Sequence, residues 1–173
     1  LKTFVDPALE GGMLNDKARE AGPLVERIEI GGETRLLYKA LPIDVAVIRA
    51  TYADTQGNCT FQREGVSAET LAIAQAAKNS GGRVIVQVED VVEYGALDTR
   101  LVRLPGIYVD AIVAAAPENH MQTFGTGYNP AYCGEVRVPV SSLKPLALDQ
   151  RKVVARRAAM ELVPNAITNL GIG

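Results

Sequence analysis

The sequence has 173 residues, of which 47% are hydrophobic and 22% are charged, and its formal net charge is −2. This composition is typical of a globular protein, and a charge near zero gives no reason to expect nucleic acid or an anionic membrane as a partner. No stretch approaches the roughly 20 consecutive apolar residues of a membrane helix. The opening segment has neither the basic region nor the apolar run of a signal peptide.

Two cysteines, Cys59 and Cys133, do not make a disulfide framework, and no Cys or His residues lie at the spacing of metal ligands. We therefore expect reduced thiols, a cytoplasmic protein and no metal site. The first residue is Leu1 rather than Met, and the sequence stops directly after a glycine-rich turn at Gly173. We interpret the chain as an internal piece of a larger protein.

The first half of the sequence predicts an α/β fold. After a Gly- and Pro-rich segment over residues 1–23, two alternating runs flank Gly31-Gly32 and predict a β-hairpin. The run "VAVI" at 45–48 predicts a strand covered on both faces. Ser67 is placed to cap a helix that reaches about Lys78 and, being apolar nearly all round, packs between layers.

Glycines after this helix and the run "RVIVQVEDVV" complete a strand–helix–strand unit, which predicts a parallel sheet. Residues 117–148 are rich in Gly, Pro and Asn and predict a long connection between domains. Asp149 then caps a helix, Pro164 ends it, and "AITNL" at 166–170 predicts a short strand before Gly171-Ile172-Gly173.

Gly171 and Gly173 are the best candidate ligand contacts, since glycine after a parallel strand lets backbone N–H groups approach an anionic or carbonyl oxygen. A tight turn without any ligand explains the pattern equally well. His120 is the only histidine and is interpreted as a surface or hydrogen-bonding residue. Glu64 is a candidate catalytic carboxylate, although exposed loop glutamates are common and no second acid is placed near it.

Seven segments, in order along almost the whole chain, resemble the class I coenzyme A transferases, above all the propionate (acetate) CoA-transferase group. They are "TFVDPALEGG", "PIDVAVIRATYADTQGNCTFQREG", "AAKNSGGRVIVQVEDVV", "PGIYVDAIV", "PENHMQTFGTGYNPAY", "RKVVARRAAMEL" and "NLGIG". The resemblance implies two similar domains, each an open, mainly parallel sheet layered with helices, with the active site between them.

The resemblance also implies a mechanism. A glutamate attacks the acyl-CoA carbonyl, and the reaction passes through an acyl-glutamyl anhydride and a glutamyl-CoA thioester. Gly171 and Gly173 match the family's loop beside that glutamate, which contributes to binding the thioester and CoA. The glutamate itself, in the family's E-[NS]-G motif, and an oxyanion glutamine in a "PQG" segment are both absent from residues 1–173.

We therefore expect no catalytic residue within these residues, no permanently bound cofactor, and coenzyme A as a substrate. Residues 1–116 are assigned to the later part of an N-terminal domain, 117–148 to an interdomain linker, and 149–173 to the start of a C-terminal domain. The expected activity is CoA transfer between short-chain acyl-CoAs, such as acetyl-CoA and propionyl-CoA, and free carboxylic acids. Expected partners are the remainder of the polypeptide and further copies in a homo-oligomer. The alternatives are an acyl-CoA hydrolase or lyase subunit on the same fold, or a non-catalytic fragment.

Overall fold

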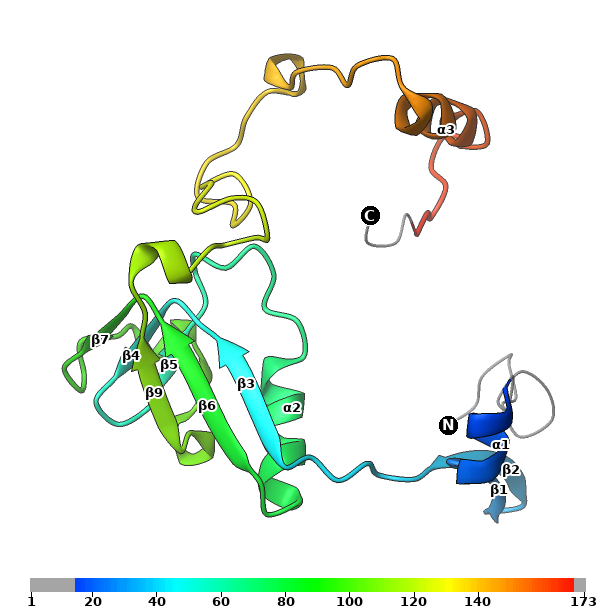
Figure 1. Cartoon of the computed structure of the whole chain (residues 1–173), viewed down its shortest axis with the longest axis vertical. Helices are drawn as coiled ribbons and strands as arrows, with labels where there is room; N and C mark the ends of the chain where they lie inside the picture. Colours follow the sequence, from blue (N-terminus) through cyan, green and yellow to red (C-terminus); the bar gives the residue numbers. More distant parts are fainter. Residues whose placement is uncertain (1–14, 170–173) are drawn as a thin grey trace. The chain divides into compact units, whose positions relative to one another are not determined.

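A computed structural model describes residues 15–169 of the chain. The residues divide into two compact units, one reaching Tyr128 and one beginning at Asn129. Figure 1 shows the elements of each unit along the sequence.

The first described elements are a short helix and a hairpin. Helix α1 (Asp16–Ala21) begins after Asn15, whose side chain accepts a hydrogen bond from the backbone N–H of Ala18 at 2.8 Å. Strands β1 (Val25–Ile30) and β2 (Glu33–Tyr38) pair antiparallel, with Ile30 opposite Glu33. Gly31 and Gly32 both have positive φ, at 61° and 79°, which is the conformation that a two-residue hairpin turn requires. The predicted hairpin is confirmed.

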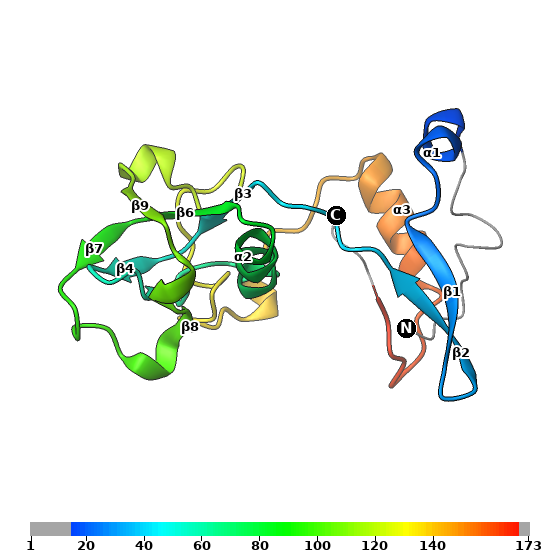
Figure 2. The ribbon, with the colours of Figure 1, turned by 90° about the horizontal axis from the view of Figure 1, so that it is seen from below.

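A parallel sheet forms the centre of the first unit. Strand β3 (Val45–Arg49) pairs with β6 (Arg83–Val88), and β6 pairs with β9 (Ala111–Ala114), giving the order β3-β6-β9. Helix α2 (Thr70–Asn79) lies in the connection from β3 to β6 and packs against both strands (Figure 2). The strand–helix–strand unit and its parallel pairing are confirmed.

A second, mixed sheet has the order β7-β4-β5-β8. Its strands are β4 (Tyr52–Asp54), β5 (Cys59–Thr60), β7 (Asp90–Val92) and β8 (Val102–Leu104), and only β4 and β7 run parallel. Short 3₁₀ helices η1 (Thr99–Leu101), η2 (Gly106–Tyr108) and η3 (Pro117–Asn119) follow in the connections. One apolar core joins the two sheets and α2, since side chains from all three belong to it.

The parallel sheet is covered on one face only by the described residues, so the prediction of a strand buried on both faces is wrong. Along β3 the side chains alternate: Ala46 and Ile48 are buried in the core, whereas Val45 and Val47 are 50% and 75% exposed. Helix α2 and the second sheet share the core on the buried side. No described element of the first unit buries the other face of β3.

Two details of α2 also differ from expectation. The helix begins at Thr70 without a side-chain cap, and Ser67 instead accepts a hydrogen bond from Arg103. Ala68, directly after Ser67, has a φ of 43°, which is incompatible with a helix starting there. In addition, only Ala74 and Ala77 of this helix are buried, so it lies on the surface of the core rather than between layers.

The second unit contains η4 (Val140–Ser142) and helix α3 (Gln150–Ala159). The side chain of Asp149 accepts a hydrogen bond from the backbone N–H of Lys152 at 2.9 Å, which confirms the predicted cap. No residue of α3 is buried. The strand expected at 166–170 is not formed over 166–169, the part of it that the structure describes. A strand needs a neighbour for its backbone hydrogen bonds, and the described second unit supplies none.

Candidate functional site

The two glycines predicted to contact ligand, Gly171 and Gly173, lie outside the described residues 15–169. Their assignment therefore stays a prediction. The other two residues singled out from the sequence, Glu64 and His120, both belong to the first unit. The structure places them next to each other, beside a cavity of that unit.

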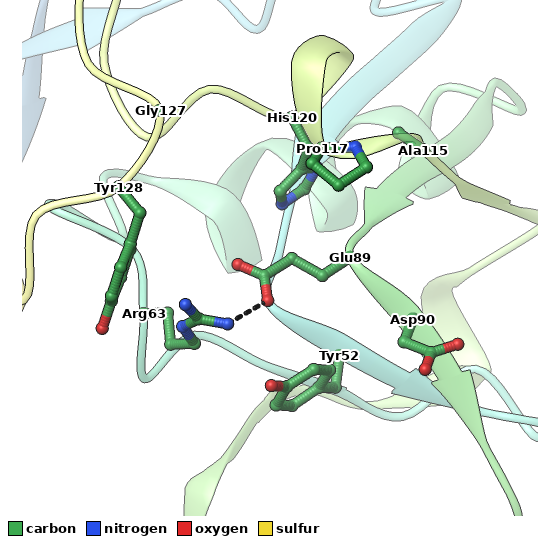
Figure 3. A pocket seen from close by; sticks show the side chains of 9 residues that line it. All are labelled: Tyr52, Arg63, Glu89, Asp90, Ala115, Pro117, His120, Gly127 and Tyr128. Atoms are coloured by element: carbon green, nitrogen blue, oxygen red, sulfur yellow. Dashed lines mark hydrogen bonds and ion pairs between the residues drawn. The ribbon is translucent and has the colours of Figure 1, made fainter.

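This cavity, which we call the tyrosine pocket, has a volume of about 570 Å³. It lies where the parallel strands β6 and β9 end, the edge at which open α/β sheets bind ligands. Figure 3 shows the side chains around it. Its lining residues are Tyr52, Arg63, Glu89, Asp90, Ala115, Pro117, His120, Gly127 and Tyr128.

An ion pair crosses the tyrosine pocket. Nη1 of Arg63 lies 2.6 Å from Oε2 of Glu89, and the guanidinium carbon lies 4.0 Å from the centroid of the Tyr128 ring (Figure 3). Hydrogen bonding to Tyr128, opposed by burial and reinforced by Tyr52 and Glu89, holds the pKa of Arg63 above its ordinary value. The guanidinium is therefore a fixed cation with a carboxylate on one side and an aromatic face on another.

His120 forms part of the wall of the pocket and is only 4% exposed. Nε of Arg49 donates to its Nε2 at 3.2 Å, and Nδ1 lies 3.0 Å from the amide nitrogen of Gln87. Because a guanidinium can only donate, Nε2 must be an acceptor. Burial, together with the charge of Arg49, lowers the pKa of His120. The ring is therefore neutral at physiological pH.

Glu64 lies behind His120 and is 9% exposed, so its interpretation as an exposed loop glutamate is wrong. Its Oε2 lies 3.5 Å from Nη1 of Arg49, while its Oε1 is buried without a hydrogen-bond partner, 3.9 Å from Nε2 of His120. Burial raises the pKa of Glu64, even though the charge of Arg49 lowers it. Glu64 does not line the pocket and is not placed to attack a substrate there.

The arrangement can therefore bind a ligand but does not provide an activated nucleophile. The cation Arg63 is already paired, Glu89 is its partner, and the neutral His120 accepts from Arg49 rather than from a hydroxyl or thiol. Within residues 15–169, no three His, Cys, Asp or Glu side chains are grouped to hold a metal ion. The same described range contains no helix with the length and hydropathy needed to cross a bilayer.

Sequence reasoning missed Tyr52, Arg63 and Glu89 as site residues. One signal was available, because Glu89-Asp90 directly follows the buried strand β6, and polar residues at that edge of a parallel sheet often face a ligand. Arg63 and Tyr52 carried no such signal. They reach the pocket only because the second sheet packs against the first.

Comparison with known proteins identifies the family. The family model described as "Coenzyme A transferase" matches residues 2–115. The chain is 51% identical over 174 residues to the caffeate CoA-transferase of Acetobacterium woodii, covering 100% of this chain and 33% of that protein. It is 40% identical over 171 residues to the acetate CoA-transferase YdiF of Escherichia coli strain K12, covering 99% and 32%.

Among solved structures, the apoenzyme of the acyl-CoA transferase YdiF from Escherichia coli O157:H7 matches with a TM-score of 0.74 and 38% identity. That match covers 99% of this chain and 32% of the other. The chain thus spans about a third of the length of the curated relatives it matches. The expected α/β fold is confirmed, and the match over residues 2–115 decides the family. The chain belongs to the coenzyme A transferase family.

Proposed function

We propose that the full-length polypeptide carrying these residues moves coenzyme A between a short-chain acyl-CoA, such as acetyl-CoA or propionyl-CoA, and a free carboxylic acid. The observation that carries this proposal is the similarity over the entire chain to two proteins named CoA-transferases, at 51% and 40% identity. The tyrosine pocket at the carboxyl edge of the parallel sheet supports it, because it supplies a place for part of a substrate.

The mechanism that fits is a ping-pong exchange through a glutamyl-CoA thioester. A glutamate carboxylate attacks the acyl carbonyl and expels CoA thiolate, which then attacks the resulting anhydride at the glutamyl carbonyl and releases the free acid. The acceptor acid reverses these steps. We place this glutamate outside residues 1–173, as the resemblance to the family implies. Gly171 and Gly173 are proposed to contribute backbone N–H groups beside it.

The organisation of the whole protein is part of the same proposal. Residues 1–116 would belong to the N-terminal domain, 117–148 to the linker and 149–173 to the C-terminal domain. The absence of buried residues in α3 supports the last assignment, since its Val153 and Val154, 57% and 67% exposed, need a surface to cover them. We further propose a cytoplasmic homo-oligomer that uses acyl-CoA and short carboxylic acids and holds no permanent cofactor.

The test separates transfer from hydrolysis. Full-length protein, acetyl-CoA and propionate should give propionyl-CoA and acetate in equal amounts, without accumulation of free CoA. Incubated with acetyl-CoA alone, the protein should gain the mass of one CoA less one water, as a glutamyl thioester requires. Release of free CoA at the same rate with and without propionate would favour a hydrolase instead. No reaction with any acyl-CoA would leave only a non-catalytic role.

The names of the two relatives differ in the acid, caffeate for one and acetate for the other. Their identities of 51% and 40% to this chain favour the first, but both names belong to those proteins alone.

A further inference from the structure

We propose that Arg63 binds the carboxylate of the free acid in the tyrosine pocket, and that the buried Gln122 is the residue that positions Arg63 for this contact. The inference rests on the proposed function, because it names the residue that holds the acid substrate. It is carried by three observations: the single hydrogen bond between Arg63 and Glu89, the fixed position of Arg63, and the space and charge around its guanidinium.

The ion pair of Arg63 uses only part of its donor set. One nitrogen, Nη1, donates to one oxygen of Glu89, Oε2, at 2.6 Å. On the surface of the same unit, Arg100 and Asp98 instead form a fork, in which Nε and Nη2 both donate to the carboxylate. An arginine carries five N–H donors in a plane, which matches the two oxygens of a carboxylate. Glu89 therefore leaves Arg63 able to bind a second oxyanion.

Two buried polar side chains hold the backbone of Arg63. Its N–H donates to Oγ1 of Thr51 at 3.0 Å, and its carbonyl accepts from the amide nitrogen of Gln122 at 2.8 Å. Thr51 is fully buried, and Gln122 is 7% exposed. The side chain of Arg63, in contrast, is 33% exposed. The interior thus fixes the point from which a solvent-accessible cation reaches into the pocket, as a preorganised binding site requires.

Tyr128 fixes the orientation of the guanidinium. The guanidinium carbon lies 4.0 Å from the centroid of the Tyr128 ring, and Figure 3 shows the group between this ring and Glu89. A side chain that is already ordered loses less conformational entropy when a ligand binds to it. A surface ion pair by itself contributes little to stability, so stabilisation of the fold does not account for this arrangement.

The pocket suits a carboxylate better than a phosphate. Glu89 and Asp90 both line it, so each further negative charge on a ligand adds repulsion. A carboxylate carries a single charge, whereas the phosphate groups of CoA carry more. The volume of about 570 Å³ leaves room for the hydrocarbon of an acid beside Ala115 and Pro117. Each carboxylate oxygen has two lone pairs, so an oxygen held by Arg63 keeps one for attack on the thioester.

The first arm of the test measures binding of propionate to the full-length protein by ligand-observed NMR. Without CoA no transfer takes place, so the Kd reports contact and not turnover. Arg63→Gln should raise the Kd about tenfold or more, the loss expected for a charge-assisted hydrogen bond. Propionamide, which has the same shape without the charge, should bind the unmodified protein more weakly by a similar factor. No saturable binding of propionate, or an equal Kd in the unmodified protein and Arg63→Gln, would overturn the inference.

Glu89→Gln separates binding of a ligand from a structural role. The variant keeps the shape of Glu89 and removes the charge that competes with the ligand for Arg63. We expect propionate to bind about threefold more tightly or better, a change opposite in sign to that of Arg63→Gln. Weaker or unchanged binding in Glu89→Gln would contradict the inference. Arg100→Gln, which breaks the exposed ion pair with Asp98, is the matched control and should leave the Kd unchanged.

The positioning role of Gln122 is tested through Arg63. Gln122→Met keeps the length of the side chain but cannot donate to the carbonyl of Arg63. It should raise the Kd about threefold or more in the unmodified background and have no further effect when Arg63→Gln is present, because its effect passes through the guanidinium. Equal effects in the two backgrounds would show that Gln122 acts only on the fold. Gln75→Met, at an exposed glutamine of α2 whose amide also donates a hydrogen bond, should leave the Kd unchanged.

The last arm identifies the oxyanion. Acetyl-CoA and acetyl-pantetheine, which lacks the phosphates, are compared as donors with propionate as the acceptor. A carboxylate at Arg63 predicts that Arg63→Gln lowers kcat/KM for both donors by the same factor. A loss confined to acetyl-CoA would mean that Arg63 holds a phosphate of CoA, and would overturn the inference.

The two proposals fail in different ways. Transfer to propionate with a Kd that does not respond to Arg63→Gln overturns the inference and leaves the proposed function standing. Absence of transfer from every acyl-CoA overturns the proposed function, whereas the binding arm still decides whether Arg63 holds a carboxylate. If Arg63→Gln does not fold, the sign of the change in Glu89→Gln decides the matter.

Discussion

Nε2 of His120 lies 3.9 Å from Oε1 of Glu64, and Arg49 contacts both residues. Both side chains are buried, and the Glu64 oxygen has no hydrogen-bond partner. The cluster holds a neutral imidazole and a carboxyl group of raised pKa around one guanidinium, directly behind the wall of the tyrosine pocket. The contributions of His120 and Glu64 to the stability of the folded protein therefore change in opposite directions with pH.

His120 should make the protein sensitive to acid. Its pKa in the folded protein is lowered below the ordinary 6.5, so the unfolded chain takes up the proton first as pH falls below 6.5. The stability that the neutral ring contributes is present above 6.5 and is lost as pH falls through the folded pKa. We expect the midpoint of thermal unfolding to drop more between pH 7.5 and 5.5 in the unmodified full-length protein than in His120→Gln. Equal drops in the two proteins would show that the ring does not titrate on unfolding.

Glu64, in contrast, should contribute less to the stability of the folded protein as pH rises. Its folded pKa is raised above 4.5, so its contribution is greatest below 4.5 and is lost as pH rises through the folded pKa. Glu64→Gln removes this ionisation and leaves Arg49 without its carboxylate partner at every pH. The difference in unfolding midpoint, variant minus unmodified protein, should therefore become more positive between pH 4.5 and 7.5. A difference that falls over this range would mean that the ion pair with Arg49 outweighs burial.

Gly106 should tolerate no side chain, because the backbone of another loop occupies the space. A Cβ built on Gly106 would lie 1.9 Å from the carbonyl oxygen of Gln56, whereas one on Gly125 meets nothing within 4 Å. The two loops are also held together by the N–H of Gly106, which donates to Oδ1 of Asn58 at 3.0 Å. Gly106→Ala should therefore cost about 3 kcal/mol of stability. Urea unfolding monitored by circular dichroism checks this, with Gly125→Ala as the control expected to unfold like the unmodified protein.

Features that depend on neighbouring residues could be predicted from the sequence. Gly31-Gly32 between two alternating runs indicates a hairpin, Asp149 indicates a helix start, and two apolar runs joined by a helix indicate the parallel pair β3 and β6. Each of these depends on turn conformation, capping or connection length. The turn and the cap are set within a few residues, and the parallel pairing follows from the order of strand, helix and strand along the chain.

Features that depend on distant partners could not be predicted in this way. The apolar run at 45–48 reads the same whether one or both faces are covered, and the structure covers one. The run at 166–170 has the composition of a strand, but it has no described neighbour to pair with. The same holds for the tyrosine pocket, where Arg63, in the turn after β5, meets Glu89, which directly follows β6. No local pattern marks such a pair.

The proposed role of Gly171 and Gly173 leads to the last prediction, which concerns the full-length protein. If backbone N–H groups of this loop face the acyl oxygen or the CoA thioester, a branched side chain at Gly173 should obstruct them. Loss of one oxyanion donor costs about 3 kcal/mol of transition-state stabilisation. Gly173→Val should therefore lower kcat for acetyl transfer to propionate on the order of a hundredfold, with KM changing much less.

The competing interpretation, a tight turn that contacts no ligand, makes a different prediction for the same variant. A turn of that kind requires glycine for its backbone conformation, so Gly173→Val would lower stability and leave the activity of each folded molecule unchanged. Circular dichroism and active-site titration by the glutamyl-CoA mass adduct together give the amount of folded, competent protein. Near-normal kcat per competent molecule would remove Gly173 from the site. A large loss of kcat with normal adduct formation would place its effect in the transfer to the acceptor acid, the second half of the ping-pong cycle.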